Sequence, residues 1–298
     1  MINRKWDCLS SFVIYDINLR YNQLRLYLIH HRPTMAHSVR MLGTGNAFLP
    51  NGRLHSLVLI DQKHLVDAPP TALIALRQNG ITVDSIETIF ITHLHGDHIF
   101  GLPFLFLERM YISDRESKKP LTIVAAPGAK EVILEICNLA YPGTLLRFWP
   151  NIIWCEDETG TTDDGWSWER FRVHHDDSVD PFGYRFVSKD GASVVHSGDS
   201  GPCEALYNSI SKSGLAVVEM GLPEWVESDH HHKPSDIQSL AELYPNTKLI
   251  ITHTFIDDKN SKFPTITESK FPSHPDNVHH ASDGDLLHWE KGHWKKVE

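Results

Sequence analysis

The chain has 298 residues, of which 41% are hydrophobic and 22% are charged, so it can bury a sizeable core and has the composition of a globular protein. Its formal net charge of −10 opposes binding of an extended nucleic acid. The charge therefore favours a small or compact partner. No apolar run approaches the ~20 residues of a membrane span, so we expect no membrane segment.

Cysteine usage and the N-terminus favour a cytoplasmic protein. The four cysteines, Cys8, Cys137, Cys155 and Cys203, are widely spaced and form no C-x-x-C motif. This spacing argues against a disulfide framework and against a cysteine zinc site. Charges interrupt the first 34 residues throughout, so they lack the apolar segment of a signal peptide.

The chain divides into an N-terminal extension of uncertain status, residues 1–35, and one domain over residues 36–298. In the domain, apolar runs alternate with segments of helical periodicity, with Gly and Pro between them. The pattern predicts strands at 38–45, 56–68, 85–93, 121–126, 151–156, 166–175, 215–221 and 248–253, and within 183–200 strands joined by a Lys-Asp-Gly turn. It predicts helices at 70–80, 101–111, 127–143, 202–214 and 233–246, and a final hairpin within 281–298. Interleaved strands and helices indicate an α/β or α+β class.

Three histidines and an aspartate follow the predicted strand 85–93 in the pattern H-x-H-x-D-H. Side chains alternate along a strand, so His93 and His95 can point the same way and share one metal ion. Gly96 allows a sharp turn, after which Asp97 and His98 can reach a second ion. The alternative is a histidine-rich surface loop, but this residue pattern favours metal binding because imidazole and carboxylate are the ligands of zinc and related cations.

Three more predicted strands end on residues that can bind metal. Asp199 follows an apolar strand in a Ser-Gly-Asp turn, and His253 ends another. The strand 166–175 ends on two histidines, and if Phe171 faces the core, His175 rather than His174 is the ligand, although both stay open. Each residue alone is better explained as a capped turn or a core histidine. Their recurrence favours one site, because strand ends on one edge of a sheet converge.

These motifs resemble the metallo-β-lactamase superfamily, and most of all its ribonuclease Z-like branch. The matching stretches are LGTGNAFLP, LVDA, IFITHLHGDHIFGLPFL, HHDDSVDPFGYRF, SGDS and LIITHTF, in that order, over residues 38 to about 290. The resemblance implies a four-layer αββα sandwich of the α+β class. It also implies two divalent metal ions: the first held by His93, His95 and His175, the second by Asp97, His98 and His253, with Asp199 bridging. Asp67 would accept a hydrogen bond from a ligand histidine.

For function, the resemblance implies a metal-dependent hydrolase in which a hydroxide bridges two divalent metals. Zn²⁺ is the expected metal, with Mn²⁺ or Fe as alternatives. A phosphodiesterase is favoured, because residual positive charge at the ions suits an anionic group. Asp97 and His231 are the residues expected in catalysis, His231 as a proton donor to the leaving oxygen. The alternatives are hydrolysis of a lactone, thioester or β-lactam carbonyl, and a non-catalytic metal- or RNA-binding scaffold.

Two departures from the tRNA-processing enzymes argue against tRNA as the substrate. Only about a dozen residues separate Tyr184 from His196, too few for the tRNA-gripping arm of those enzymes. Lys233 also replaces the small hydroxyl residue that follows the histidine corresponding to His231. The expected partner is therefore a small or compact anionic substrate, and a homodimer is compatible with the sequence. The C-terminal histidines are expected at the surface or at the pocket rim: His274, His279, His280, His288 and His293.

Overall fold

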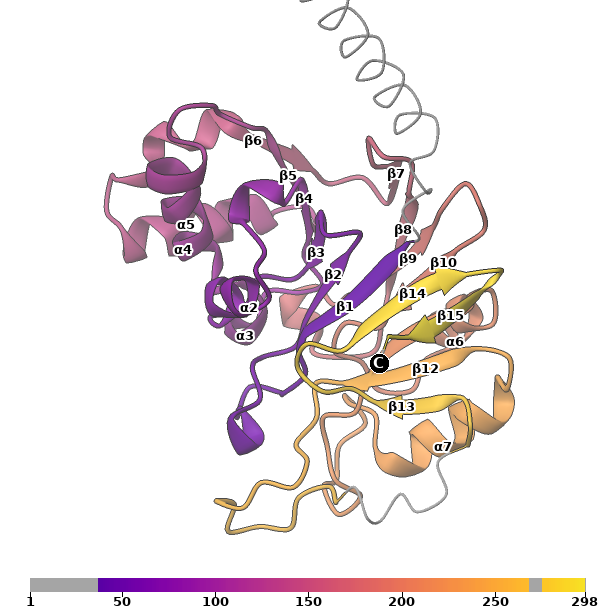
Figure 1. Ribbon diagram of the computed structural model, residues 1–298. Helices are drawn as coiled ribbons and strands as arrows, with labels where there is room; N and C mark the ends of the chain where they lie inside the picture. The colour runs from indigo at the N-terminus through magenta and orange to yellow at the C-terminus, as the bar shows by residue number, and fades with distance from the viewer. Residues whose placement is uncertain (1–36, 268–274, 298) are drawn as a thin grey trace, which may run out of the picture. The chain divides into compact units, whose positions relative to one another are not determined.

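Two β-sheets packed face to face form the centre of the molecule in the computed structural model, which describes residues 37–267 and 275–297. Helices cover the outer face of each sheet, as Figure 1 shows for α2, α4 and α5 on one side and α6 and α7 on the other. The predicted four-layer αββα architecture of the α+β class is confirmed.

The first sheet has eight strands in the order β15-β14-β1-β2-β3-β4-β5-β6. It is antiparallel from β15 to β3 and parallel from β3 to β6. Its strands are β1 Ser38–Gly43, β2 Leu57–Ile60, β3 His64–Val66, β4 Thr88–Phe90, β5 Leu121–Val124, β6 Ile152–Cys155, β14 Leu286–Glu290 and β15 His293–Lys296.

The second sheet has seven strands in the order β13-β12-β11-β10-β9-β8-β7. Strands β10 to β13 are parallel, whereas β7 to β10 are antiparallel. Its strands are β7 Thr159–Thr161, β8 Ser167–Arg172, β9 Phe182–Val187, β10 Ser193–His196, β11 Leu215–Glu219, β12 Lys248–Thr252 and β13 Val278–His280.

Helices follow the parallel strands, as expected for crossover connections. They are α2 Ala72–Gln78, α3 Gly96–Ile99, α4 Leu102–Glu108, α5 Ala129–Ala140, α6 Glu204–Ile210 and α7 Pro234–Leu243. In the described part of the chain, none of them has the length and apolar character needed to cross a lipid bilayer.

Three apolar cores hold the four layers together. The central core lies between the sheets and contains Phe90, Trp166, Tyr184 and Phe186. The other two cores lie between each sheet and its helices. Burying a large apolar side chain contributes about 1.5–3 kcal/mol, so the central aromatic cluster holds the two sheets, and hence their strand ends, in a fixed relation.

The single strand predicted at 56–68 is wrong, because the segment forms the hairpin of β2 and β3. The chain reverses at Asp61 and Gln62, whose φ angles are 49° and 59°. Two consecutive left-handed residues are typical of a type I′ turn, which usually contains Asn or Gly. Because this turn has neither, its residues carry no hairpin signal of that kind.

Three of the C-terminal histidines, His279, His280 and His288, are half-buried rather than fully exposed. His279 and His280 lie in strand β13, beside β12, and both are half-buried. His279 Nε2 lies 2.7 Å from the Asp285 carboxylate, so this side chain ties the edge of the second sheet to the turn before β14. His293 is exposed on β15 as expected, His288 is half-buried in β14, and His274 lies outside the described residues. The boundary between the extension and the domain also lies outside them and stays a prediction.

Candidate metal centre

Strand ends from both sheets bring histidine and aspartate side chains together. The loop after β4 carries His93 and His95, α3 carries Asp97 and His98, and the segment after β8 carries His175. Asp199 follows β10, and His253 follows β12. Strands β10, β11 and β12 are parallel neighbours, so their carboxyl ends meet at one edge of the second sheet.

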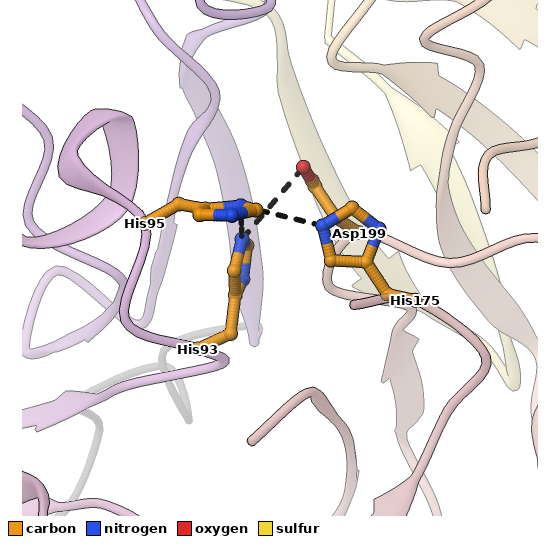
Figure 2. A group of neighbouring side chains, drawn as sticks. All are labelled: His93, His95, His175 and Asp199. Atoms are coloured by element: carbon orange, nitrogen blue, oxygen red, sulfur yellow. Dashed lines mark hydrogen bonds and ion pairs between the residues drawn. The ribbon is translucent and has the colours of Figure 1, made fainter. Parts of the chain in front are cut away.

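The first group consists of His93, His95, His175 and Asp199, whose side chains come from three segments and point toward one another in Figure 2. Nδ1 of His95 lies 3.1 Å from Nε2 of His93 and 3.3 Å from Nε2 of His175. The Asp199 carboxylate lies 3.8 Å from His93 Nε2. Within this group His95 is half-buried, and the other three residues are buried.

The second group consists of Asp97, His98, His253 and again Asp199. Nε2 of His98 lies 3.6 Å from the Asp97 carboxylate and 3.4 Å from that of Asp199. Nε2 of His253 lies 3.4 Å and 3.3 Å from the same two carboxylates. Asp199 therefore belongs to both groups, as the bridging role predicted for it requires.

Backbone and side-chain acceptors fix which ring nitrogen faces the centre. The Thr92 hydroxyl donates to Asp67 at 2.8 Å, so it accepts a hydrogen bond from Nδ1–H of His93 at 3.0 Å. Nδ1–H of His98 donates to Asp67 at 2.7 Å, and Nδ1–H of His175 donates to the His230 carbonyl at 3.0 Å. In each of these three rings Nε2 therefore faces the shared centre, which is the orientation that a metal ligand needs.

The donor atoms are spaced as a divalent cation would require. A tetrahedral ion with bonds of about 2.0–2.1 Å to nitrogen and oxygen places its ligand atoms ~3.3 Å apart. The pair distances given above, 3.1–3.8 Å, are close to that separation, and all ligand atoms of each group lie within 4.8 Å of one another. Imidazole lone pairs directed at one another at this distance repel unless a proton or a cation lies between them. Both groups therefore fit a metal ion.

Burial and charge set the protonation of the centre. Burial, together with the neighbouring charge of His98, holds the pKa of His93 well below its usual value, and burial also lowers the pKa of His175. Burial would raise the pKa of Asp199, but the adjacent His253 and His98 hold it well below its ordinary range. Neutral His93 and His175 beside an ionised Asp199 are in the protonation states that bind metal. Burial would lower the pKa of His98, but the charges of Asp199 and Asp67 raise it well above its usual value, so a cation bound there would displace a proton from its ring.

Unusual backbone conformations position two of these residues. His253 has φ 51° and Asp67 has φ 69°, in the left-handed region that non-glycine residues rarely adopt. Such residues cost of order 1–3 kcal/mol and persist at functional sites because the surroundings impose them. Gly198, with φ 61°, makes the turn before Asp199, where a Cβ would lie 2.6 Å from the Phe182 carbonyl oxygen.

His231 lies beside both groups and pairs with a buried glutamate. Its ring centroid lies 4.8 Å from that of His175 and 5.9 Å from that of His253. Nδ1 of His231 lies 2.9 Å from the carboxylate of Glu219, which is 1% exposed. Burial would lower the pKa of His231, but the charge of Glu219 and its hydrogen bond raise it to about 9. The ring is therefore protonated at neutral pH.

Glu219 is the residue that the sequence analysis missed. It ends β11, the strand between β10 and β12, and so occupies the same edge as Asp199 and His253. The signal that selected those residues, an apolar strand ending in a metal-ligating or acidic side chain, is also present in LAVVE. Glu219 also accepts hydrogen bonds from the backbone N–H of Ser200 and of Gly221. It thereby links the turn that carries Asp199 to His231.

The structure brings together the seven side chains predicted as metal ligands: His93, His95, Asp97, His98, His175, Asp199 and His253. It places His175 in the first group, whereas the side chain of His174 is 43% exposed and points away. Asp67 accepts a hydrogen bond from His98, as expected of it.

Comparison with known proteins gives a family match and distant relatives. A family model described as "Anti-Pycsar protein Apyc1" matches residues 37–218, more than half of the chain. A ribonuclease Z of Bacillus thuringiensis (strain Al Hakam) is 33% identical over 167 residues, which are 52% of this chain and 51% of that protein. The chain thus spans about half the length of the curated relatives it matches.

Solved structures share the fold. Human tRNase Z, short form, superposes with a TM-score of 0.63 at 22% identity, covering 85% of this chain and 99% of that chain. The metallo-β-lactamase fold protein YhfI from Bacillus subtilis superposes with a TM-score of 0.65 at 16% identity, with the same coverage. The predicted membership of the metallo-β-lactamase superfamily, with a distant likeness to ribonuclease Z, is confirmed.

Proposed function

The chain belongs to the anti-Pycsar protein Apyc1 family, and from this membership and the site geometry we propose that it is a phosphodiesterase that hydrolyses a cyclic nucleotide. The observation that carries the proposal is Asp199, which both groups of metal-binding side chains share. A shared carboxylate is the arrangement by which two cations are held close enough to act on one phosphate. When bound, two divalent cations supply the chemistry of a metal-ion hydrolase, by acidifying the attacking water and offsetting charge on the phosphate.

Asp67 acts on the site by positioning its ligands. It accepts hydrogen bonds from the Thr92 backbone N–H and hydroxyl and from His98 Nδ1–H. These bonds fix the loop 92–98 and the orientation of the His98 ring. Asp97, in α3, adds a carboxylate that faces His98 and His253. Preorganised ligands of this kind keep the centre from rearranging during the reaction.

His231 is the proposed proton donor. Its Nδ1–H donates to Glu219, which leaves Nε2–H for the leaving oxygen of the substrate. With a pKa raised to about 9, the ring carries the proton at neutral pH and can release it as negative charge develops on that oxygen.

A tight hairpin supports a compact substrate. Strands β9 and β10 are joined by residues 188–192 alone, at the position where the tRNA-processing enzymes are expected to carry their arm. The net charge of −10 also favours a small anion, drawn to a local cationic centre, over an extended nucleic acid. The donor set of imidazole and carboxylate suits zinc as the resident cation.

The test is a substrate panel for the zinc-loaded protein. The panel contains cyclic pyrimidine and purine nucleotides, a chromogenic phosphodiester, a tRNA precursor, a lactone and a thioester. We expect turnover of at least one cyclic nucleotide to the linear monophosphate, and loss of that turnover in Asp199→Ala. Faster turnover of the lactone or thioester would favour the carbonyl hydrolase instead, and fewer than one bound ion per chain would favour a non-catalytic scaffold.

A further inference from the structure

Two histidines and an aspartate form a third group outside the candidate metal centre. Nε2 of His174 lies 3.2 Å from the Asp229 carboxylate, and Nε2 of His230 lies 3.9 Å from it. The two rings are nearly perpendicular, with centroids 5.4 Å apart. One ligand atom of each residue lies within 4.8 Å of the other two. This group shares no residue with the two groups described above.

The backbone holds the two segments of this group side by side. Gly201 N–H donates to the His174 carbonyl at 2.8 Å, and a Cβ on Gly201 would lie only 1.6 Å from the Asp229 carbonyl oxygen. The His230 carbonyl accepts the hydrogen bond from His175 Nδ1–H. The three side chains therefore extend from anchored backbone into solvent, and a bound ion would have to order only side chains.

The ligand set indicates the class of cation. Two imidazoles and one carboxylate suit Zn²⁺, Co²⁺ or Ni²⁺, whereas Mg²⁺ and Ca²⁺ prefer oxygen ligands. The side chains are 43%, 81% and 48% exposed for His174, Asp229 and His230. Three protein ligands at an open surface leave coordination positions to water, so the ion would exchange with the solvent rather than stay resident.

We propose that His174, Asp229 and His230 form a third, exchangeable site for a divalent transition-metal cation at the rim of the metal centre. The site is coupled to the centre through the backbone, because His174 directly precedes His175 and the His230 carbonyl orients the His175 ring. An ion there would restrain both segments and so stabilise the position of His175. The proposal concerns metal binding and does not depend on the substrate of the enzyme.

The test counts bound zinc in the wild type and in a His174→Ala/Asp229→Asn double variant. Both proteins are dialysed to equilibrium against stepped free Zn²⁺ concentrations, and the metal content per chain is measured. We expect equal contents at low free Zn²⁺, and one ion per chain more in the wild type at high free Zn²⁺. High Zn²⁺ should also raise the melting temperature of the wild type more than that of the double variant, and Mg²⁺ should show no difference.

His293→Ala is the matched control, because His293 is also exposed but lies on β15, away from this group. It should bind zinc as the wild type does. Equal zinc contents of wild type and double variant at all concentrations would overturn the proposal, as would a loss of the same ion in the control. Anomalous diffraction from zinc-soaked wild-type crystals tests the site without a variant: a peak between His174 and His230 supports it, and its absence at saturating zinc overturns it.

Discussion

Replacing Glu219 by glutamine tests whether His231 supplies a proton. Glu219 is buried and lies 2.9 Å from His231 Nδ1, and its negative charge overcomes burial to raise the pKa of His231 to about 9. Glu219→Gln removes the charge but keeps an oxygen that can accept the same hydrogen bond. Burial then lowers the pKa of His231 against only the weaker effect of Asp199, and this pKa should fall to about its usual ~6.5.

The size of the effect follows from the fraction of His231 that is protonated. Because the raised pKa keeps the proton on the ring up to about pH 9, the wild type loses its proton donor only as the pH rises through that value. With a pKa of ~6.5, the variant is mostly protonated at pH 6 but only ~3% protonated at pH 8, against ~90% in the wild type. The rate should therefore be similar at pH 6 and about 30-fold lower in the variant at pH 8.

The assay is the pH profile of kcat/KM on the best substrate of the panel, from pH 5.5 to 10, at saturating zinc. Metal content and melting temperature are measured for each protein, because the new amide would also face the Gly221 N–H that now donates to Glu219. Glu227→Gln is the control: it removes an exposed charge from the loop between β11 and α7 that carries His231, and it should keep the wild-type pH profile. If Glu219→Gln lowers the rate by the same factor at pH 6 and pH 8, His231 is not the acid.

Three further changes test the centre and its supports. Asp199→Ala should lower bound metal and reduce turnover more than about 100-fold, because loss of a ligand shared by both groups weakens metal binding more than loss of a residue that only orients a ligand. Full metal content by elemental analysis would contradict its bridging role. Asp67→Asn should weaken metal binding by about 10–100-fold in a chelator competition, with the fold kept, whereas unchanged affinity would show that its hydrogen bonds are dispensable. Gly201→Ala should lower the free energy of unfolding by about 1–3 kcal/mol in a denaturant titration, because its Cβ would overlap the Asp229 carbonyl. Gly214→Ala, whose Cβ would meet nothing nearer than 3.5 Å, is the control, and equal losses in both variants would refute the steric argument.

The order of the main strands and helices was predictable because each carries its own local signal. Helix α2 ends just before Gly80, and α5 and α7 show an apolar stripe at helical spacing. The hairpin of β2 and β3 was not predictable, because its turn at Asp61 and Gln62 contains no glycine or asparagine although both residues adopt left-handed backbone. The short strands β7 and β13 were missed because their pairing partners, rather than their own sequences, make them strands.

In the candidate site, too, the residues with a local sequence signal were predicted, and those defined by distant partners were not. The spacing of His93, His95, Asp97 and His98 is local, so the sequence carries it. The choice of His175 over His174 rested on alternation along a strand. Strand β8 ends at Arg172, before both histidines, and the structure places His175 with the other ligands and His174 with Asp229 and His230. Glu219 escaped notice because its partner, His231, lies twelve residues away on a separate loop.

By itself the sequence determined which residues can bind metal and that they follow apolar strands, since both properties depend on residue type and near neighbours. Only the tertiary structure decided that Asp199 is shared by two groups, that Glu219 raises the pKa of His231, and that His174 meets Asp229 and His230 at the rim. These are contacts between segments distant in the chain, and their distances and burial are set by the packing of two sheets against one core. No pattern along a single segment records that packing.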